Sequence, residues 1–512
     1  KILDHTKMLV VTPRHWSRGG RLLASGAAGL VVVLVGVLRR SPYAAPRTLA
    51  TGRASSSKKT AFGGVSATYA ARASEYCNAK PPSGAEGEAP ASYELAGATL
   101  IIRHGARAAI HDPPLAQNAG AFACDLDELT RTVLGDWAAL PETTTLDDDD
   151  GATTCAPGQL LERGFRQHVA LGECLGERYA PHGSRPWSWR ARATDYQRTR
   201  ASAAALLTGF FAGVPGEHRV PVAADESLEP MWGAHPYRGP RCDRAASLIA
   251  GKQPISRNFT AFTDATAFFP SRTTTTPGAP SPGDRRLTSI ADAVYSHYCE
   301  RDAEPVCSRV DPEACVPGLE VLRAADAAYA EQYDGPDGGR RSTQLGMQPL
   351  LREILDGLLQ LTTRSPVLAV YAAHDTVVAP AAAALGVFDG RWPPLASRLV
   401  FELWTTTAQA YVRILYNGEP RTDRVPGCAA AAPEDATLCP LHVVSAAVDA
   451  LLDGAPSFAD ACAVGGSSPS SVVSARAPSS REREDDDEPP PHGSQRRRRR
   501  RRRRLRRTAP SP

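Results

Sequence analysis

The stretch Leu100-Ile101-Ile102-Arg103-His104-Gly105-Ala106-Arg107 decides the fold prediction for this chain. Residues 98–102 are almost wholly apolar, which predicts a short strand buried on both faces of a sheet. The strand ends at two arginines on either side of a histidine, and the following glycine allows a tight turn or a close approach to a ligand. Arginine offers planar, permanently charged donors that match phosphate or carboxylate, so this strand end is a candidate anion site. On these residues alone, a basic surface turn is the alternative.

Charge is distributed unevenly along the chain. The 512 residues carry a net charge of +4, but residues 1–90 carry +9 and residues 476–512 carry +8, which leaves −13 for residues 91–475. The part expected to fold is therefore acidic. A nucleic-acid binder would need a basic face on the folded domain itself, so no nucleic acid is expected as a partner of the body.

The cysteines indicate an oxidising compartment. Eleven are scattered along the chain without a CxxC pair, which disfavours a zinc ribbon or finger. Disulfides fit better, and the odd count leaves at least one thiol unpaired. Cys428 and Cys439 enclose a short loop and are the pair we expect to be joined. The sequon Asn258-Phe259-Thr260 agrees with passage through the secretory pathway.

The N-terminal region predicts a membrane anchor or a signal peptide. After a short basic segment, residues 1–21, comes the uncharged 17-residue segment Leu22–Leu38, just long enough to span a bilayer. Our first interpretation is a type II signal anchor, giving a single-pass protein of the Golgi or cell surface. The second is a cleaved signal peptide, giving a secreted protein, and a buried core helix is the alternative to both. Residues 39–90 are expected to be a disordered stalk.

The first part of the predicted body, residues 91–211, contains two helices beside the sheet. Apolar residues recur on one helical face from about Gly158 to Tyr179, which predicts an amphipathic helix. Residues 187–193 alternate like a strand, and Thr194-Asp195-Tyr196-Gln197 has the form of a capping box. The helix that follows, to about residue 211, places Arg198 in its first turn, where free backbone N–H groups favour an anion.

The rest of the chain divides into three parts. Residues 212–335 are loop-rich and are expected to form a smaller helical and irregular inserted subdomain. Residues 336–462 form the second part of the body. Residues 463–512 turn to Ser, Pro and acidic low complexity and then to a run of nine arginines, and we expect them to be disordered.

A second histidine also stands at a strand end. Residues 367–371 predict another buried strand, which ends at Ala373-His374-Asp375-Thr376. Residues 399–404 and 411–416 predict an antiparallel pair that ends at the turn Asn417-Gly418. Ligands gather outside the carboxyl ends of parallel strands, so we expect the two histidine segments and Arg198 to converge.

Two histidines, clustered arginines and one aspartate favour phosphoryl transfer through a covalent histidine intermediate. The arginines would neutralise the phosphoryl oxygens, a neutral imidazole is a capable nucleophile, and a carboxyl group can protonate the departing alkoxide. The motifs GxxxxGK[ST], HExxH and GxSxG are all absent from the sequence, which removes support for an NTPase, a zincin and an α/β-hydrolase.

Residues 103–107 match the RHGxR signature of the histidine acid phosphatases, the branch-two histidine phosphatases that include phytases. Residues 158–179 resemble the GQLTxxGxxQHxxLGxxLRxRY helix of this family, residues 192–202 its RSTDxxRTxxSA segment and residues 371–376 its YSAHDT element. The resemblance covers roughly residues 93–445 in the right order. Two departures are Ala108, where the family usually has proline, and Leu161, which replaces the Thr of GQLT.

The resemblance implies an α/β fold, a mainly parallel sheet sandwiched by helices with a smaller helical inserted subdomain. It implies an acid phosphatase that hydrolyses phosphate monoesters, with no metal and no cofactor. The implied catalytic residues are His104, as the nucleophile that forms a phosphohistidine, and Asp375, as the proton donor. The implied phosphate-binding residues are Arg103, Arg107, Arg198 and His374.

Alternatives remain for the substrate and for activity itself. The predicted anchor and stalk resemble the architecture of the Golgi member of the family that acts on 2-phosphoxylose, so a sugar-phosphate or inositol-phosphate phosphatase is one alternative. A catalytically inactive member serving as a ligand-binding ectodomain is another, which the presence of all six expected site residues disfavours. A polyanion binder built on the arginine tail is a third, which the acidic body disfavours.

Overall fold

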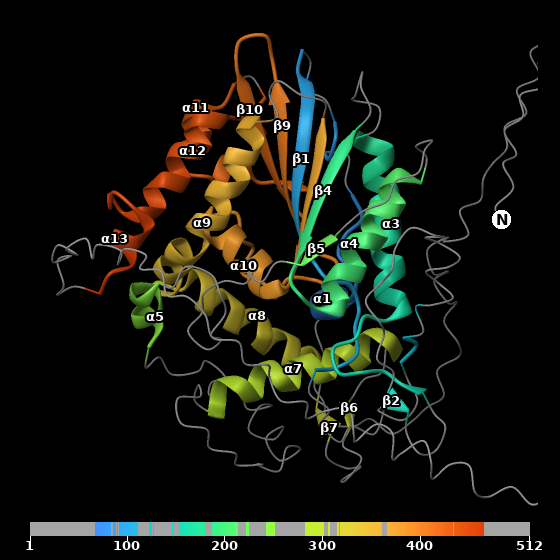
Figure 1. Cartoon of the computed structure of the whole chain (residues 1–512). Coiled ribbons are helices and arrows are strands. Elements are labelled where there is room, and N and C mark those ends of the chain that lie inside the picture. The colour runs from blue at the N-terminus through green and yellow to red at the C-terminus, as the bar shows by residue number, and fades with distance from the viewer. Residues whose placement is uncertain are drawn as a thin grey trace, which may run out of the picture. The chain divides into compact units, whose positions relative to one another are not determined.

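The structure is a computed structural model (Figure 1), and it describes residues 67–82, 85–88, 90, 92–110, 122–124, 126, 146–147, 153–179, 187–212, 222–224, 242–250, 282–301, 306–307, 315–316, 318–360, 366–433 and 435–464. The predicted N-terminal segment, the signal anchor, the first part of the stalk, the sequon and nearly all of the C-terminal tail lie outside these residues. Within the described residues, no helix combines the length and the apolar character needed to cross a bilayer.

A mixed sheet forms the centre of the body. Its strands are β1 (Glu94–Arg103), β4 (Ser188–Ala193), β5 (Val222–Ala224), β8 (Val367–Ala373), β9 (Arg398–Thr405), β10 (Ala410–Tyr416), β11 (Glu419–Pro420) and β12 (Cys439–Pro440). Their order is β11-β10-β9-β1-β8-β4-β5, with β12 also paired to β10. The strands β1, β8, β4 and β5 run parallel, while β9, β10, β11 and β12 form an antiparallel extension. The predicted α/β sheet and the predicted antiparallel pair are confirmed.

β1 is buried on both faces because its side chains alternate between two cores. Leu100 and Ile102 pack in the core that contains α3 (Glu162–Tyr179) and α4 (Gln197–Phe211). Ile101 lies in the opposite core, with α9 (Gly339–Leu359) and α10 (Asp375–Ala384). Figure 1 shows α3 and α4 to the right of the sheet and α9 with α10 to its left. The predicted sandwich of helices around the sheet is therefore present.

The remaining described elements lie around this sandwich. The helices are α1 (Ala67–Cys77), α5 (Asp243–Ile249), α7 (Pro282–Arg301), α8 (Gly318–Asp334), α11 (Cys428–Ala431), α12 (Leu441–Asp449) and α13 (Phe458–Cys462), with short 3₁₀ turns at Thr422–Arg424 and Ala450–Leu452. Two small antiparallel ribbons pair β2 (Leu146–Asp147) with β3 (Thr153–Thr154) and β6 (Val306–Cys307) with β7 (Cys315–Val316). Figure 1 places α7 and α8 below the lower end of the sheet.

The segment expected to be an inserted subdomain contributes to the main sheet. Within residues 212–335, β5 pairs with β4, so Val222–Ala224 belong to the sheet and not to an insertion. The later described elements of this segment are mainly helical, as expected. A separate helical subdomain after Ala224 stays a prediction.

The expectation of a disordered stalk up to residue 90 is wrong for its last part. Within α1, Arg72 forms a buried ion pair with Asp326 at 2.8 Å. Cys77, at the end of α1, is joined to Cys299 of α7. Ala73 and Tyr76 of this helix pack in the core, but its ion-pair and disulfide partners lie 254 and 222 residues away in sequence, which local patterning does not show.

A buried ion pair also ties the chain after α1 to the sheet. Glu86 contacts Arg398 at 2.7 Å, and the two side chains are 0% and 1% exposed. Both carboxylate oxygens of Glu86 accept from this guanidinium. The folded body therefore begins well before residue 91.

The disulfides agree with an oxidising compartment. The predicted bond between Cys428 and Cys439 is present. Two further disulfides join Cys124 to Cys155 and Cys242 to Cys462. Among the described cysteines, Cys174 has a free thiol, as the odd count requires of at least one.

Replacement of Glu86 by alanine is expected to lower the free energy of unfolding by about 3–5 kcal/mol, because it leaves the Arg398 guanidinium buried without its carboxylate. Denaturant unfolding of the full chain measures the change. Glu88→Ala is the matched control, because Glu88 is exposed, and it is expected to cost less than about 0.5 kcal/mol. Equal stability of the two variants would show that residues 85–88 are not part of the fold.

Candidate active site

Three neighbouring parallel strands end at the same edge of the sheet. The register places Arg103, the last residue of β1, opposite Ala373, the last residue of β8. The backbone N–H of His104 donates to the carbonyl of Ala373 at 3.1 Å, and that of Thr194 donates to the carbonyl of Ala372 at 3.1 Å. The residues that follow β1, β8 and β4 therefore lie side by side, and the structure brings together the segments that were expected to converge.

The loop after β1 is held against α3 and α4. Gly105 lies so close to Gly164 of α3 that a Cβ on Gly105 would overlap the Gly164 backbone. The backbone N–H of Gly105 donates to Ser202 Oγ at 3.2 Å. His168 Nε2 donates to the carbonyl of Arg103 at 3.1 Å, since a carbonyl only accepts. These glycine, serine and histidine positions of the quoted patterns fix the loop that carries His104.

His104 is buried in a defined tautomer. The imidazole is 2% exposed, and its Nδ1 lies 2.8 Å from the carbonyl oxygen of Gly105. Nδ1 must therefore carry the proton, which leaves the lone pair on Nε2. Arg107 Nε donates towards this lone pair across 3.4 Å. Burial, followed by the charges of Arg107, Arg198 and Arg103, holds the pKa of His104 well below its usual value, so the ring is neutral.

Arg103 is fully buried and paired with Asp375. Its Nη2 lies 2.9 Å from Asp375 Oδ2 and donates to the Tyr76 hydroxyl at 3.1 Å. Its Nη1 donates to the carbonyl of Pro393. The guanidinium also lies over the rings of Tyr76 and Trp392, 5.2 Å and 5.3 Å from their centroids. Burial lowers the pKa of Arg103, but Asp375, Tyr76 and Tyr329 together outweigh burial, so the net pKa is raised.

Asp375 is the first residue of α10, and both its carboxylate oxygens accept hydrogen bonds. Oδ2 accepts a hydrogen bond from the indole N–H of Trp392 at 2.7 Å, in addition to its ion pair with Arg103. Oδ1 accepts from the backbone N–H of Thr376 at 2.9 Å. Burial raises the pKa of Asp375. Arg103, the Trp392 hydrogen bond and the other nearby positive charges together lower it by more than burial raises it, so the net pKa lies below the usual value. The carboxyl group is therefore ionised in the ligand-free site.

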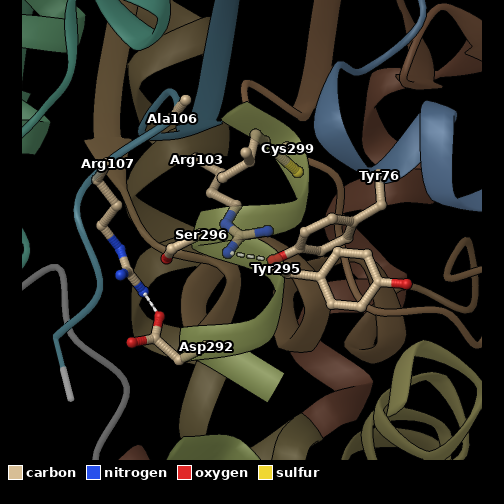
Figure 2. Close-up of a pocket in the computed structure, with 9 residues that line it drawn as sticks. Tyr76, Arg103, Ala106, Arg107, Asp292, Tyr295, Ser296 and Cys299 are labelled. Atoms are coloured by element: carbon tan, nitrogen blue, oxygen red, sulfur yellow. Dashed lines mark hydrogen bonds and ion pairs between the residues drawn. The ribbon is translucent and has the colours of Figure 1, made fainter. Parts of the chain in front are cut away.

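Arg107 is held from the opposite side by α7. Its guanidinium forms an ion pair with Asp292, whose second oxygen accepts from the backbone N–H of Ile110 at 2.8 Å. Figure 2 shows Arg103 and Arg107 approaching α7 on either side of Ser296. The small cavity between them is about 10 Å³, close to the size of one water molecule. Arg107 and Arg103 are thus fixed by different carboxylates.

Arg198 has no such partner among the described residues. It is the second residue of α4, and its guanidinium lies over the ring of Tyr196, 4.3 Å from the centroid. Among the residues that the structure describes, no carboxylate lies within ion-pair distance of Arg198, and its Nε is buried without a hydrogen-bond partner. Burial, and then the charge of Arg107, lower the pKa of Arg198 to about 10. The neighbouring Arg192 and Arg200 instead pair with Glu353 and Asp195, respectively.

His374 completes the set of predicted residues. Its Nε2 lies 2.8 Å from Thr194 Oγ1, and its ring centroid lies 5.5 Å from that of His104. Burial, and then the charge of Arg198, hold the pKa of His374 well below its usual value. All six predicted residues therefore meet at one edge of the sheet, where three guanidiniums face the two carboxylates of Asp375 and Asp292.

The predicted capping box is wrong. Helix α4 begins at Gln197 with Tyr196 as its N-cap residue, and no side chain caps it. The Thr194 hydroxyl contacts His374 and Thr199 Oγ1 instead. Gln197 Oε1 accepts from the backbone N–H of Leu160 at 2.9 Å. Both side chains of the expected box are therefore used for contacts between elements, because the end of β4 lies against β8.

Four residues of the site were not predicted: Thr194, Tyr76, Asp292 and Trp392. Thr194 lay in a quoted pattern but was assigned to the cap. Asp292 lay in the segment expected to form the helical and irregular subdomain, as one polar residue among several. Tyr76 and Trp392 stand in segments without a recognisable pattern, and local sequence carries no signal of their place in the site.

The sequence model described as "Histidine phosphatase superfamily (branch 2)" matches residues 94–417. The chain belongs to this superfamily. The prediction of the family, and with it that of a phosphoric monoester hydrolase of the histidine type, is confirmed.

Named relatives of this histidine phosphatase include two from Mus musculus. Testicular acid phosphatase is 28% identical over 333 residues, which cover 58% of this chain and 75% of that protein. The protein 2-phosphoxylose phosphatase 1 is 25% identical over 388 residues, which cover 69% of this chain and 77% of that protein. Among solved structures, the phytase from D. castellii has 13% identity and a TM-score of 0.47, over 76% of this chain and 87% of the phytase.

Replacement of Gly105 by alanine is expected to lower phosphatase activity by about 100-fold, because the new Cβ must push the His104 loop away from α3 and displace the reacting group. Steady-state kinetics with an aryl phosphate checks this. Gly346→Ala in α9 is the matched control, because a Cβ at Gly346 meets no atom within 4 Å. It is expected to leave activity unchanged, and comparable losses in the two variants would contradict the account.

Proposed function

We propose that this histidine phosphatase hydrolyses phosphate monoesters in two steps through a phosphohistidine at His104, with an acidic pH optimum. One observation carries the proposal. A neutral imidazole with its lone pair on Nε2 is buried beside three guanidiniums, one of which has no carboxylate partner among the described residues. Such an arrangement suits attack on a phosphorus atom whose oxygens are held by arginine.

Phosphate binding falls to Arg103, Arg107, Arg198 and His374. With Asp375 protonated, the three guanidiniums and the Asp292 carboxylate leave a charge of about +2, which a phosphate dianion would neutralise. Arg198, which has no carboxylate partner among the described residues, would form charge-assisted hydrogen bonds with it. Arg103 and Arg107 keep Asp375 and Asp292 as second partners, which orient the two guanidiniums. His374, whose Nε2 contacts Thr194 Oγ1, lies beside His104 and Arg198 and is proposed to contact the phosphate as well.

In the first step, His104 Nε2 forms a bond to phosphorus as the ester P–O bond breaks. The leaving oxygen takes the electron pair of the broken bond and a proton from Asp375. This carboxyl group is ionised in the ligand-free site, but a bound dianion beside it offsets the arginine charges and favours its protonation.

In the second step, water attacks the phosphorus of the phosphohistidine. The Asp375 carboxylate accepts a proton from this water, the P–N bond breaks, and its electron pair returns to Nε2. Phosphate then leaves, and the starting state of both residues is restored.

The natural substrate is proposed to be a small phosphate monoester or a phosphorylated sugar. The similarity to testicular acid phosphatase and to 2-phosphoxylose phosphatase 1 supports this range. The described disulfides support a place in the secretory pathway or outside the cell. Attachment to a membrane through residues 22–38 remains a proposal from the sequence. The assembly of all six site residues favours an enzyme over an inactive binding ectodomain.

His104→Ala is expected to reduce hydrolysis of p-nitrophenyl phosphate by more than about 1,000-fold, because the nucleophile is lost. Acid-labile labelling with ³²P-phosphate ester, trapped by rapid alkaline quench, is expected in the wild type and not in the variant. His442→Ala is the control, since His442 is exposed on α12, and it should keep both activity and labelling. A labelled His104→Ala variant would exclude His104 as the nucleophile.

The rate with an alkyl phosphate such as β-glycerophosphate is expected to fall as pH rises, because the Asp375 proton is lost. The leaving group of 2,4-dinitrophenyl phosphate needs no proton, so its rate should fall much less. Asp375→Asn is expected to slow the alkyl ester by about 10²–10⁴-fold and the dinitrophenyl ester far less. Single-turnover release of the leaving group measures these rates. Equal loss on both substrates would rule out Asp375 as the proton donor.

A further inference from the structure

We propose that Trp392 is a positioning residue for the proton donor: its indole N–H fixes Oδ2 of Asp375, so that Oδ1 is the oxygen that delivers the proton. This inference rests on the proposed function, because it concerns the atom through which Asp375 acts. Trp392 lies in the segment between α10 and β9, and its side chain is buried.

The hydrogen bonds of Asp375 distinguish its two oxygens. Oδ2 accepts a hydrogen bond from Trp392 Nε1 at 2.7 Å and forms an ion pair with Arg103 Nη2 at 2.9 Å. A proton on Oδ2 would face the guanidinium and compete with the indole N–H for the lone pairs of this oxygen, so Oδ2 is the less favourable place for the proton. Among the described residues, Oδ1 accepts a single hydrogen bond, from the backbone N–H of Thr376 at 2.9 Å. Its second lone pair is therefore open to carry the proton.

Trp392 is itself held at its backbone by a buried ion pair. Its N–H donates to Asp326 Oδ1 at 2.9 Å, and its carbonyl accepts from Arg72 Nη2 at 2.7 Å. The same Arg72 and Asp326 are paired with each other at 2.8 Å. The backbone of Trp392 is thus anchored to both α1 and α8, which fixes the point from which the indole reaches Asp375.

Two aromatic rings pack against the indole. Trp392 stacks on Tyr329 with centroids 5.9 Å apart and an interplanar angle of 25°, and it lies against Tyr76 with centroids 4.3 Å apart. Tyr76 and the ion-paired Arg72 both belong to α1, which precedes the residues 94–417 matched by the superfamily. The support of the proton donor therefore comes partly from a helix outside the matched region.

This arrangement has a consequence for the reaction. In the first step the Oδ1–H bond breaks and a hydrogen–oxygen bond forms on the leaving group, while Oδ2 keeps the indole hydrogen bond and the ion pair with Arg103. Both interactions stabilise the carboxylate that results, which makes Asp375 a stronger acid, and the indole hydrogen bond fixes its orientation. Loss of the indole N–H should raise the pKa of Asp375 and loosen the carboxyl group.

The test compares Trp392→Phe with Trp404→Phe in the full chain. Trp404 is a matched control, because its Nε1 donates to Glu402 Oε2 at 3.0 Å in the core on the α3 side of the sheet. Single-turnover release is measured against pH with β-glycerophosphate and with 2,4-dinitrophenyl phosphate. For W392F we expect the descending limb with glycerophosphate to move to higher pH by about 0.5–1 unit, as the loss of a hydrogen bond to a charged group implies. The limiting rate of W392F with glycerophosphate should fall about three- to tenfold, whereas its rate with dinitrophenyl phosphate should stay within about twofold of the wild-type rate. W404F should leave the descending limb at the same pH as in the wild type.

Each other outcome overturns a distinct claim. If the wild type is active and W392F keeps the descending limb at the same pH, the positioning role is overturned. It is also overturned if W392F loses the same share of its rate with both substrates. A wild type inactive on both substrates overturns the proposed function, and the positioning role falls with it. If W392F fails to fold, replacement of Trp392 by benzothienylalanine, which has sulfur in place of the indole N–H, preserves the ring shape. The same shift is then expected, and an unshifted limb overturns the inference.

Discussion

The burial of three guanidiniums at one edge of a sheet is the constraint on which the rest of the site depends. Arg103 and Arg107 are each neutralised by a carboxylate, Asp375 and Asp292, whereas Arg198 has none among the described residues. A buried charge without a partner costs free energy of folding, and an anionic ligand that binds beside it offsets this cost. Burial, reinforced by the same positive charges, lowers the pKa of His104 and keeps its imidazole neutral. One buried cluster of charges thus favours both a dianion site and an unprotonated nucleophile.

The fold brings this charge together by ending three parallel strands at one edge and packing helices tightly against their loops. The contact between Gly105 and Gly164 lets α3 approach the His104 loop at backbone distance. On the other side, α7 supplies Asp292. Helix α1 supplies Tyr76, and its Arg72 donates a hydrogen bond to the backbone carbonyl of Trp392. The disulfide between Cys77 and Cys299 joins α1 to α7, so the two helices on this side of the site are covalently linked.

Much of this could be predicted from sequence, because the signals were local. The apolar run before Arg103 and that before His374 predicted buried strands, and the rule for strand ends predicted that both histidines would meet. What escaped prediction depends on contacts between distant segments. Arg72 and Asp326 are 254 residues apart, so the ion pair that holds α1 leaves no pattern in the local sequence. The indole of Trp392 contacts Asp375 because the chain after α10 returns to the site. The Thr194 hydroxyl contacts His374 and does not cap α4, because the ends of β4 and β8 lie side by side.

The central claim is that the guanidinium of Arg198, which has no carboxylate partner among the described residues, makes this cluster a phosphate site. Calorimetric titration of the full chain with inorganic phosphate tests this claim directly, because it measures the affinity for phosphate and not the rate of hydrolysis. Arg198→Met is expected to weaken phosphate binding at least tenfold, because charge-assisted hydrogen bonds are lost. Arg200→Met, two residues further along α4 and paired with Asp195, is expected to bind phosphate like the wild type. Equal affinity of the wild type and Arg198→Met, or an equal loss in both variants, would contradict the account.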